Sequence, residues 1–502
     1  MKGKVVLIGA GPGDLGLMTI KGLEEMKNAD VVVYDRLVGE DILKFIPENA
    51  EKIDAGKKAS EHKIPQNEIN KILLEKALSG KKVIRLKGGD CFLFGRGGEE
   101  IELLKENNVE FEVVPGITSA LAVPAYAGIP VTHRDFASSV HIIAGHKKNN
   151  EPLDVDFKSC VKCGGTLVFL MGSANIKYIS ESLILNGMPK DMPCGVIENG
   201  TYPNQRKIIS TISKITKVCE DEKIESPAVI IVGKVCGLSS DFDWYSRLPL
   251  KGKRVVVTRP EDRAESLSGK LRKMGAYVIE YPCIETISLL DDSLVYDILE
   301  KIKLYDYIAF TSPAGVKYVF DSFFERNIDG RVFFGKKIAV IGKATGDELK
   351  KYGLFYDIIP ENHDGKSLGI LLGRIAEGKK VLLLRAKEGG ADITEEFQKA
   401  KVLFDDTAVY YTKYINNDGD VLKNKILNGE VDYVTFTSSS IVKAFTNCVK
   451  QGYDKFTGVC IGEKTNSEAI KYGINTIVSK RADIDDMVSV IVSEVRKCQK
   501  VL

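Results

Sequence analysis

Short apolar runs alternate with longer amphipathic stretches along the whole chain. The runs are rich in β-branched residues and end in glycine or small polar residues, and stretches of ten or more residues with helical periodicity separate them. This alternation is typical of α/β units, in which a helix follows each strand and returns the chain to the same sheet. In the first half we expect strands at residues 4–8, 30–34, 82–86, 111–114, 140–144, 166–170 and 228–232, and helices that include residues 18–27 and 97–106.

The segment DFDWYSRLPLKGK at residues 241–253 interrupts this alternation. It carries the only tryptophan, a proline and a glycine, and a new strand-like run, RVVVT, follows at residues 254–258. A chain of 502 residues is also too long for one ordinary hydrophobic core. We therefore expect one α/β domain at residues 1–240, a linker at 241–250 and a second α/β domain at 251–502.

The second half contains an internal repeat. DYIAFTSPAGVKYVF at residues 306–320 and DYVTFTSSSIVKAFT at residues 432–446 agree at seven of fifteen positions. A second shared pattern, I-G-x-x-T-x-x-E-x-x-K-Y-G, follows at residues 341–353 and 461–473. Two similar lobes are implied, with the matching strand ends at 311–312 and 437–438 lining a cleft between them.

Composition and charge exclude several classes of protein. Hydrophobic residues make up 44% and charged residues 28%, a balance typical of a folded globular chain. The net charge of +2, from 71 basic and 69 acidic residues, lacks the basic excess of non-specific nucleic-acid binding. No apolar run approaches the ~18 residues of a membrane span, and the N-terminus does not resemble a signal peptide. We expect a cytoplasmic protein without nucleic-acid or membrane partners.

The cysteines and histidines do not predict a metal site. Ten cysteines lie along the chain without a dense framework, which in a reducing compartment favours thiols over disulfides. Cys160 and Cys163 have CxxC spacing, but no second pair completes four zinc ligands. A redox pair and an ordinary pair of loop thiols both remain open. The five histidines show no metal-binding spacing.

Two glycine-rich segments carry the candidate chemistry of the first half. IGAGPGD at residues 8–14 lies between a strand and a helix, as a dinucleotide loop does, but Asp14 stands where the fingerprint needs glycine and Pro12 removes a backbone N–H. An adenosyl ligand without phosphates suits this loop better. RLKGGDCFLFGRGGEE at residues 85–100 combines five glycines, Asp90, an apolar run and two arginines. This mixture suits a flat ligand that the backbone approaches closely.

These motifs, with VYDRLV at residues 33–38, VPGITSA at 114–120 and FLMG at 169–172, resemble the tetrapyrrole methyltransferases and in particular the uroporphyrinogen-III C-methyltransferases. The resemblance covers roughly residues 1–240, and Cys91 departs from it because the family commonly has proline there. It implies two lobes, at about 1–115 and 116–240, and a homodimer formed through this half. The implied reaction is methylation of uroporphyrinogen III at C2 and C7, by way of precorrin-1, to precorrin-2. S-adenosylmethionine is the implied methyl donor and S-adenosylhomocysteine the by-product.

The resemblance also assigns roles by position. Asp35 matches the family's proposed proton acceptor and Lys57 its donor. The candidates for contacts with the substrate's carboxylates are Arg36, Lys58, Arg96 and Arg134. Arginine can pair with a carboxylate through two hydrogen bonds, but each of these residues can also be a solvated surface charge. Met171 by its chemistry alone is more typical of core packing than of a ligand contact. The segments that contact the cofactor contain Pro12, Gly88, Gly89, Asp90, Leu93, Thr118, Ser119, Met171, Gly200 and Ala228.

Motifs of the second half resemble the uroporphyrinogen-III synthases over roughly residues 251–502. They are VVVTRP at 255–260, the two FTS strand ends, IGKAT at 341–345, VYYT at 409–412 and IGEKT at 461–465. The resemblance implies two flavodoxin-like lobes, one from residues 251–285 plus 413–502 and the other from 286–412. The implied reaction closes hydroxymethylbilane with inversion of ring D and releases water.

Tyr410 matches the tyrosine that assists departure of the hydroxyl group, although Tyr411 is adjacent and packing within a strand is an alternative for Tyr410. The candidate substrate contacts in the cleft are Ser312, Thr345, Ser438 and Thr465.

The sequence thus predicts a fusion of two consecutive enzymes whose partners are small tetrapyrroles, on a path toward cobalamin or sirohaem. Two alternatives remain. The second half can be a catalytically silent tetrapyrrole-binding module, or the first half can methylate another tetrapyrrole or a different substrate.

Overall fold

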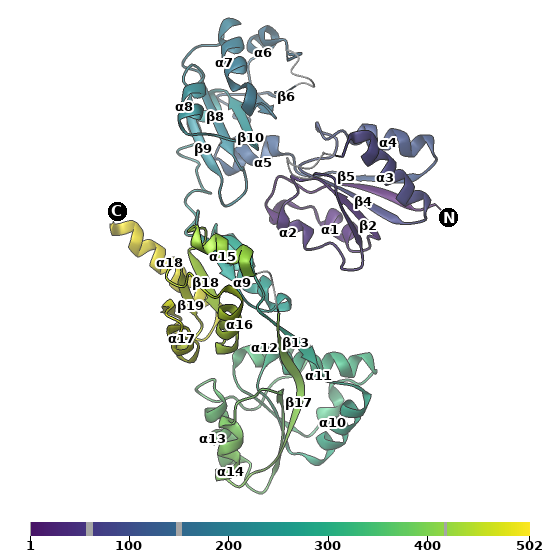
Figure 1. Cartoon of the computed structure of the whole chain (residues 1–502), viewed down its shortest axis with the longest axis vertical. Coiled ribbons are helices and arrows are strands. Elements are labelled where there is room, and N and C mark those ends of the chain that lie inside the picture. Colours follow the sequence, from purple (N-terminus) through teal and green to yellow (C-terminus); the bar gives the residue numbers. More distant parts are fainter. Residues whose placement is uncertain (1, 57–63, 147–152, 416–418, 502) are drawn as a thin grey trace. The chain divides into compact units, whose positions relative to one another are not determined.

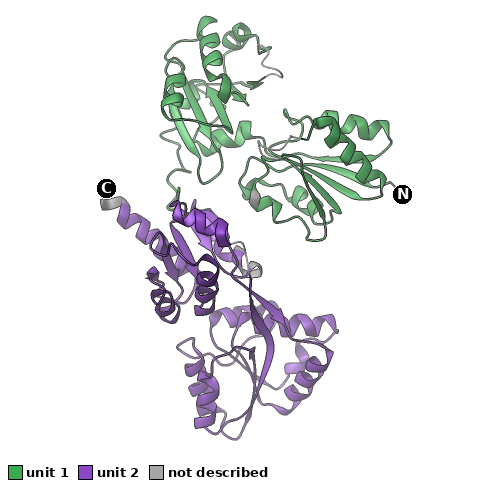
Figure 2. Cartoon of the chain, in the orientation of Figure 1, with its two compact units in different colours: residues 1–252 green, residues 253–502 purple. Residues whose placement is uncertain are grey.

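The computed structural model describes residues 2–56, 64–146, 153–415 and 419–501 of the chain. The chain divides into two compact units, residues 1–252 and 253–502 (Figure 2). The described part of each unit contains two five-stranded sheets with helices packed on them (Figure 1). This architecture confirms the expected α/β fold. No helix among the described residues has both the length and the apolar character needed to cross a membrane.

The first sheet of unit 1 is entirely parallel, with strand order β3-β2-β4-β1-β5. Its central strands β1 and β4 are buried along almost their whole length because helices cover both faces. The strands are β1 (Lys4–Gly9), β2 (Val31–Tyr34), β3 (Glu51–Asp54), β4 (Lys82–Lys87) and β5 (Glu110–Val114). The helices are α1 (Ile20–Met26), α2 (Glu40–Leu43), α3 (Gln66–Leu78) and α4 (Gly97–Glu106).

The second sheet of unit 1 is mixed, with strand order β6-β7-β10-β8-β9 and β6 at one edge. Its strands are β6 (Val140–Ala144), β7 (Thr166–Leu170), β8 (Pro193–Glu198), β9 (Arg206–Thr211) and β10 (Ala228–Val232). The helices that accompany it are α5 (Ser119–Tyr126), α6 (Phe157–Cys163), α7 (Ile176–Leu185) and α8 (Ile215–Asp221). All seven strands expected in unit 1 are present, each within one residue of its expected bounds.

In unit 2, one sheet is entirely parallel, with strand order β12-β11-β18-β19-β20. Its strands are β11 (Arg254–Val257), β12 (Tyr277–Glu280), β18 (Tyr433–Phe436), β19 (Thr457–Cys460) and β20 (Asn475–Val478). The helices beside it are α9 (Glu261–Lys273), α15 (Gly419–Leu427), α16 (Ser439–Val449), α17 (Glu463–Ile470) and α18 (Ile484–Val501).

The other sheet of unit 2 has strand order β13-β17-β16-β14-β15 and is parallel except for β13, which runs antiparallel to β17. Its strands are β13 (Ile284–Ser288), β14 (Tyr307–Phe310), β15 (Lys337–Val340), β16 (Lys380–Ala386) and β17 (Leu403–Tyr414). Its helices are α10 (Asp292–Leu304), α11 (Pro313–Glu325), α12 (Lys343–Lys351), α13 (Gly365–Ile375) and α14 (Asp392–Lys399).

The internal repeat corresponds to matching strand–helix units in the two sheets of unit 2. Asp306 precedes β14 and its carboxylate accepts the N–H of Lys380 at 3.0 Å; Asp432 precedes β18 and accepts the N–H of Arg254 at 2.8 Å. Ser312 then caps α11 and Ser438 caps α16. The two lobes therefore share local contacts as well as sequence.

Residues 241–252 pack against unit 1. The Trp244 Nε1–H donates to the Ala125 carbonyl at 3.0 Å, and the buried Tyr245 donates its O–H to the Thr201 carbonyl at 3.2 Å. The Lys251 Nζ donates to the Pro203 carbonyl at 2.6 Å and lies 4.1 Å from the centre of the Tyr245 ring. Burial lowers the pKa of Lys251 to about 8. These side chains anchor the expected linker to unit 1.

Candidate active sites

Three loops of unit 1 meet at the carboxyl ends of parallel strands β1, β4 and β5. The Gly11 N–H donates to the Gly89 carbonyl at 3.1 Å, and the Gly89 N–H donates back to Gly11 at 2.7 Å. The Gly116 N–H donates to Asp90 Oδ2 at 3.0 Å. Because ligands of α/β sheets bind at this edge, the structure brings the expected cofactor residues around Pro12, Gly89 and Thr118 into one place.

Asp90 organises this loop. Its Oδ1 accepts the N–H groups of Phe92 and Leu93 at 2.8 and 3.0 Å, in addition to the Gly116 bond on Oδ2. These contacts fix the conformation of the loop. Phe94 and Arg96 both have left-handed backbone angles, with φ of 55° and 59°. Such strain in non-glycine residues persists where the surroundings impose it, which is common at ligand sites.

Gly89 shows that the cradle formed by these loops has room for a ligand. Its φ is +69°, and a Cβ built on it would meet no atom within 4 Å. A Cβ on the neighbouring Gly116 would lie 2.2 Å from the Gly89 carbonyl oxygen, so here the backbones themselves are in contact. Exposed backbone polar groups beside apolar side chains suit the adenosyl and methionyl parts of S-adenosylmethionine. The residues present therefore fit the expected cofactor.

The remaining expected cofactor residues lie on the second sheet of unit 1. Met171 follows the end of β7 and Ala228 begins the adjacent antiparallel β10. Met171 is 52% exposed, so it does not fill the core as its chemistry alone suggested. Gly200 packs on Val123 of α5, because a Cβ there would lie 2.3 Å from the valine side chain. Thr118 caps that helix through its Oγ1, which accepts the Ala120 N–H at 3.2 Å, and Ser119 is its first residue.

Asp14 connects the two sheets of unit 1. Its Oδ2 accepts the Tyr126 O–H at 2.7 Å, and its backbone N–H donates to Thr201 Oγ1 at 3.3 Å. Burial and the hydrogen bond to Asp14 raise the pKa of Tyr126. The glycine-rich loop after β1 is thereby fixed against residues of the second sheet.

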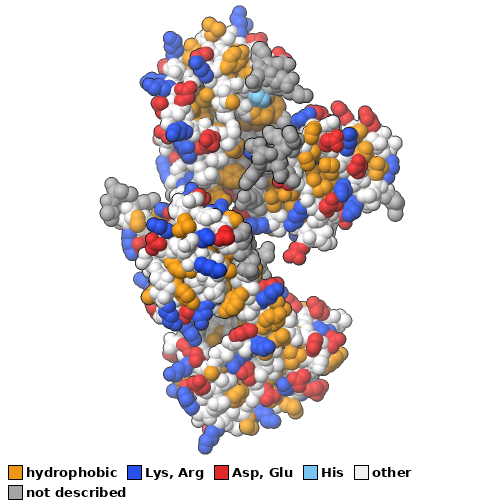
Figure 3. All heavy atoms as spheres, in the orientation of Figure 1, with side chains coloured by type: hydrophobic (Ala, Val, Ile, Leu, Met, Phe, Trp, Pro, Cys, Tyr) orange, Lys and Arg blue, Asp and Glu red, His pale blue; other side chains and the backbone are white. Residues whose placement is uncertain are grey.

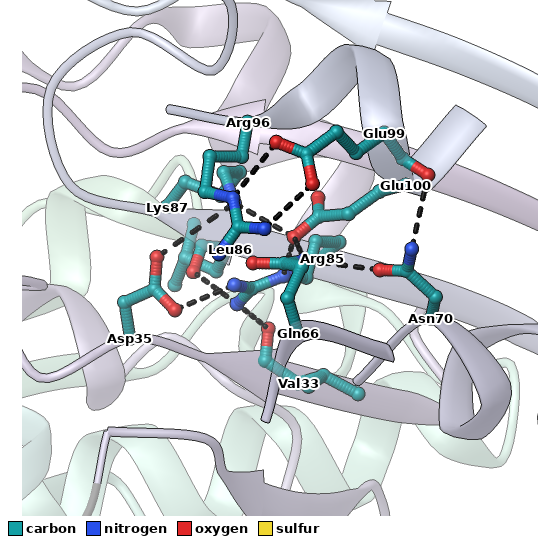
Figure 4. A network of polar contacts seen from close by, with 10 residues as sticks. All are labelled: Val33, Asp35, Gln66, Asn70, Arg85, Leu86, Lys87, Arg96, Glu99 and Glu100. Carbon is teal, nitrogen blue, oxygen red and sulfur yellow. Dashed lines mark hydrogen bonds and ion pairs between the residues drawn. The ribbon is translucent and has the colours of Figure 1, made fainter. Parts of the chain in front are cut away.

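Asp35, the expected proton acceptor, belongs to a network of charged side chains (Figure 4). The Arg85 Nη2 donates to Asp35 Oδ1 at 2.5 Å, and the Arg85 Nε donates to Glu100 Oε1 at 3.0 Å. The Lys87 Nζ donates to the same Glu100 oxygen at 2.8 Å, as does Gln66 at 2.9 Å. Asp35 is thus held by a cation from the neighbouring strand.

The interior of this network is buried. Arg85 is 1% exposed, Lys87 3% and Glu100 0%. Burial lowers the pKa of Arg85, but Glu100 and Asp35 together raise it above the ordinary value. Sequence reasoning named neither Lys87 nor Glu100. The signal was available in KVIRLK, since Arg85 and Lys87 lie beyond the first residue of a strand whose other interior positions are apolar, and buried cations need partners.

The candidate arginines of unit 1 are all exposed: Arg36, Arg96 and Arg134. Arg96 forms two hydrogen bonds with Glu99, at 2.8 and 2.6 Å. Lys57, the expected proton donor, and Lys58 lie outside the described residues.

Unit 1 contains a cavity of about 450 Å³, which is lined by Phe94, by residues 142–144 of β6 and by residues 153–156. Its mixed apolar and polar lining suits a large amphipathic ligand.

In unit 2, Tyr410 lies beside a helix cap. Its O–H donates to Ser312 Oγ at 2.9 Å, and its side chain is largely buried. The Tyr318 ring lies 5.8 Å away, and the Tyr318 hydroxyl is hydrogen-bonded to Thr286. Because neighbouring residues of a strand point to opposite faces, Tyr411 does not share this position. The two adjacent tyrosines therefore point to opposite faces of the sheet, and Tyr410 is the one beside Ser312.

The other expected residues of unit 2 lie at matching helix starts. Thr345 and Thr465 are the third residues of α12 and α17, and both are buried. Ser438 Oγ accepts the Ile441 N–H at 3.3 Å and is hydrogen-bonded to Ser440 at 2.8 Å. Ser312 and Ser438 therefore cap their helices in the same way, but the second partner is Tyr410 in one lobe and Ser440 in the other.

Within the described residues, no group of three or more His, Cys, Asp or Glu side chains is arranged to hold a metal ion. Cys160 is half-buried and Cys163 exposed, both on α6. Burial raises the pKa of the Cys160 thiol.

The fold and the sites define a two-unit α/β enzyme. Comparison with known proteins specifies the class of each unit. Residues 4–216 match the family model of tetrapyrrole (corrin/porphyrin) methylases, and residues 265–489 match that of uroporphyrinogen-III synthase HemD. The porphyrin biosynthesis protein HemD of Ruminiclostridium josui is 47% identical over 488 residues, which cover 97% of each chain. The present chain therefore belongs to the family of fused tetrapyrrole methylases and uroporphyrinogen-III synthases.

Other relatives match one unit. The sirohaem synthase of Escherichia fergusonii is 49% identical over 245 residues, 49% of this chain and 53% of that protein. A solved uroporphyrin-III C-methyltransferase of Thermus thermophilus is 36% identical, with 47% of this chain and 100% of that chain covered and a TM-score of 0.41. The uroporphyrinogen III synthase of the same organism is 15% identical, with 49% and 100% covered and a TM-score of 0.39.

The two family models and the relative that matches both units confirm both expected enzyme classes and the role in tetrapyrrole synthesis. The chain combines an S-adenosylmethionine-dependent methyltransferase with a uroporphyrinogen-III synthase.

Proposed function

We propose that unit 2 closes hydroxymethylbilane to uroporphyrinogen III with inversion of ring D, and that unit 1 methylates this product at C2 and C7 to give precorrin-2 by way of precorrin-1. The observation that carries the proposal is the presence of both families in one chain, joined over nearly the whole length of a similar fused relative. The product of one reaction is the substrate of the other.

In unit 1, bound S-adenosylmethionine supplies an electrophilic methyl group. The loops that contain Pro12, Gly89 and Thr118 hold this donor so that a pyrrole carbon can approach the methyl carbon in line. As the new C–C bond forms, the S–C bond breaks and its electron pair stays on sulfur, which leaves as S-adenosylhomocysteine. Asp35 Oδ2 then accepts a proton from the substrate ring system, while Arg85 keeps the carboxylate in place through Oδ1.

In unit 2, Tyr410 assists the departure of the substrate's hydroxyl group. The C–O bond breaks, and the oxygen leaves as water with a proton that the tyrosine hydroxyl helps to deliver. Ser312 orients that hydroxyl at 2.9 Å. The two lobes mainly fold a reactive linear molecule into the shape that closes the ring, an effect of position more than of any single group.

Several finer assignments belong to the same proposal. They are the domains at residues 1–240 and 251–502, substrate contacts by Arg36, Arg96, Arg134, Ser312, Thr345, Ser438 and Thr465, and a homodimer formed through the methyltransferase half. Exposure of the three arginines supports a substrate that carries several carboxylates, and the size and mixed lining of the cavity beside Phe94 support a large amphipathic one.

An anaerobic assay of the full-length chain tests the proposal. Freshly prepared hydroxymethylbilane and S-adenosylmethionine are supplied, and products are followed by absorbance and mass. Dimethylated product of the type III isomer is expected. Accumulation of uroporphyrinogen I, or its methylation, would show that unit 2 is a silent binding module. Formation of uroporphyrinogen III without its methylation would show that unit 1 methylates a different substrate.

A further inference from the structure

Two cations of β4 lie beside Asp35 on one face of the first sheet of unit 1. Arg85 and Lys87 are two residues apart on the strand, so their side chains point to the same side. Sheet register pairs Tyr34 with Leu86, and the Asp35 N–H donates to the Leu86 carbonyl at 3.2 Å, so Asp35 continues β2 next to Lys87. The pairing of β2 with β4 therefore brings both cations within reach of the Asp35 carboxylate.

The two oxygens of this carboxylate have different surroundings. Oδ1 accepts a hydrogen bond from the Arg85 Nη2 at 2.5 Å. Oδ2 accepts no hydrogen bond from the residues that the structure describes, and the Lys87 Nζ lies 3.9 Å from it, beyond hydrogen-bond distance. The Asp35 side chain is 32% exposed, whereas Lys87 is buried. Part of the Asp35 carboxylate is thus open to a substrate, and Oδ2 is the oxygen without a donor.

Glu100 holds the Lys87 ammonium at this distance. Lys87 lies between two carboxylates, and its Nζ donates to Glu100 Oε1, the buried one, at 2.8 Å (Figure 4). Arg85 and Gln66 donate to the same oxygen, while the buried Oε2 accepts no hydrogen bond within the described part of the chain. Two cations and two carboxylates balance in this network. Without the charge of Glu100, Asp35 would be the carboxylate left for Lys87.

We propose that Glu100 is a positioning residue for methyl transfer: it binds the Lys87 ammonium and thereby keeps Oδ2 of Asp35 free to accept a proton from the substrate. The inference rests on the proposed role of Asp35 in unit 1. A charge-assisted hydrogen bond from Lys87 to Oδ2 would have to break before that oxygen could accept the proton. Arg85 does not compete with the substrate in this way, because it occupies Oδ1.

The first test removes the charge of Glu100 in the full-length chain. Glutamine at this position keeps an accepting oxygen for Lys87 and Arg85 and can place its NH2 group where Oε2 accepts no hydrogen bond. For Glu100→Gln, kcat for methylation of supplied uroporphyrinogen III should fall about tenfold to a hundredfold, the cost of breaking one hydrogen bond between charged groups. KM for uroporphyrinogen III and the affinity for S-adenosylhomocysteine, measured by calorimetry, should stay within twofold of wild type. The matched control is Glu102→Gln, an exposed position on the same helix α4, which should change none of these values.

A second pair of variants separates this role from a purely structural one. Glu100→Gln combined with Lys87→Met leaves one cation, Arg85, opposite Asp35, so the charges balance again and no ammonium can occupy Oδ2. The combined variant should methylate at least about fivefold faster than Glu100→Gln alone, a reversal that marks coupled residues. Glu100→Asp keeps the charge and should lose less of the rate than Glu100→Gln. A combined variant as slow as Glu100→Gln, or a loss of S-adenosylhomocysteine affinity in Glu100→Gln that parallels the loss of kcat, would overturn the proposal.

A crystal structure of the Glu100→Gln variant tests the positioning without an assay. The Lys87 Nζ should lie within about 3.2 Å of Asp35 Oδ2, instead of the present 3.9 Å. If the wild type does not methylate uroporphyrinogen III but the variant shows this shift, the substrate proposed for unit 1 is wrong and the positioning of Lys87 by Glu100 stands. An ammonium that stays on the new amide at 3.9 Å or more from Oδ2 would overturn the proposal, whatever the activity.

Discussion

At the scale of single residues, the methyltransferase site depends on groups fixed by charge and by backbone geometry. Asp35 is held by Arg85, which is itself held by the buried Glu100. A carboxylate with a fixed orientation can accept a proton without reorganisation of its surroundings. We therefore expect substitutions here to affect the chemical step more than the binding of the methyl donor.

Asp35→Asn should lower the rate of methylation about a hundredfold or more, because an amide cannot accept the proton. Affinity for S-adenosylhomocysteine, measured by calorimetry, should stay within twofold of wild type. Glu102→Gln is a suitable control for a change of charge nearby, since Glu102 is exposed and lies on the same helix as Glu100. Unchanged turnover of Asp35→Asn would remove this carboxylate from the mechanism.

Gly89→Val should weaken S-adenosylhomocysteine binding at least about tenfold. A β-branched residue at φ +69° is strained, and its side chain would enter the open space of the cradle. The matched control is Gly98→Ala, because Gly98 lies in the first turn of α4 at an ordinary φ and a Cβ there also meets nothing within 4 Å. Normal affinity of the Gly89→Val variant would contradict our placement of the donor.

At the scale of elements, most strands of unit 1 could be predicted from the sequence because strands that are buried on both faces are continuous apolar runs. VVVY and AVIIV are examples. The strands that sequence analysis missed include β3, with EKID, and β9, with RKIIST, which are polar and partly exposed at sheet edges. Edge strands are bonded to one neighbour only and need no apolar run, so their sequences resemble loops.

The candidate site was predictable where local motifs form it and less so where distant residues meet. The loop around Asp90 could be predicted as part of the site because its glycines lie close together in one segment of the sequence. The contact between Lys87 and Glu100 depends on where α4 lies relative to β4. This relation is not visible from periodicity alone.

Tyr410→Phe should lower the rate of uroporphyrinogen III formation about tenfold to a hundredfold. The loss is smaller than the loss of an essential general acid would cause, because ring closure depends strongly on substrate folding. Tyr411→Phe is the matched control on the same strand and should change the rate less than twofold. The measurement is the ratio of type III to type I isomer in the product. Equal effects of the two substitutions would contradict the assignment of Tyr410.

At the scale of the whole molecule, the visible surface carries interspersed charges of both signs (Figure 3), as the net charge of +2 implies. Under the proposed function, recognition of acidic tetrapyrroles would rely on local cations and not on the field of the whole protein. The chain divides into two compact units, and residues 241–252, the last segment of unit 1, are anchored to the rest of that unit through Trp244, Tyr245 and Lys251.

This anchoring predicts where the chain can be divided. A fragment that ends at Gly252 retains the buried Tyr245 and should unfold cooperatively and methylate supplied uroporphyrinogen III at a rate near that of the full chain. A fragment that ends at Ser240 loses these contacts and should be less stable by about 3 kcal/mol or more, the cost of removing one buried aromatic side chain. Urea denaturation followed by circular dichroism measures the difference. Equal stability of the two fragments would show that residues 241–252 only connect the units. Mixed with a fragment of residues 253–502, the longer fragment should still complete the two-step conversion, but more slowly at low protein concentration, because a tether raises the local concentration of the second enzyme.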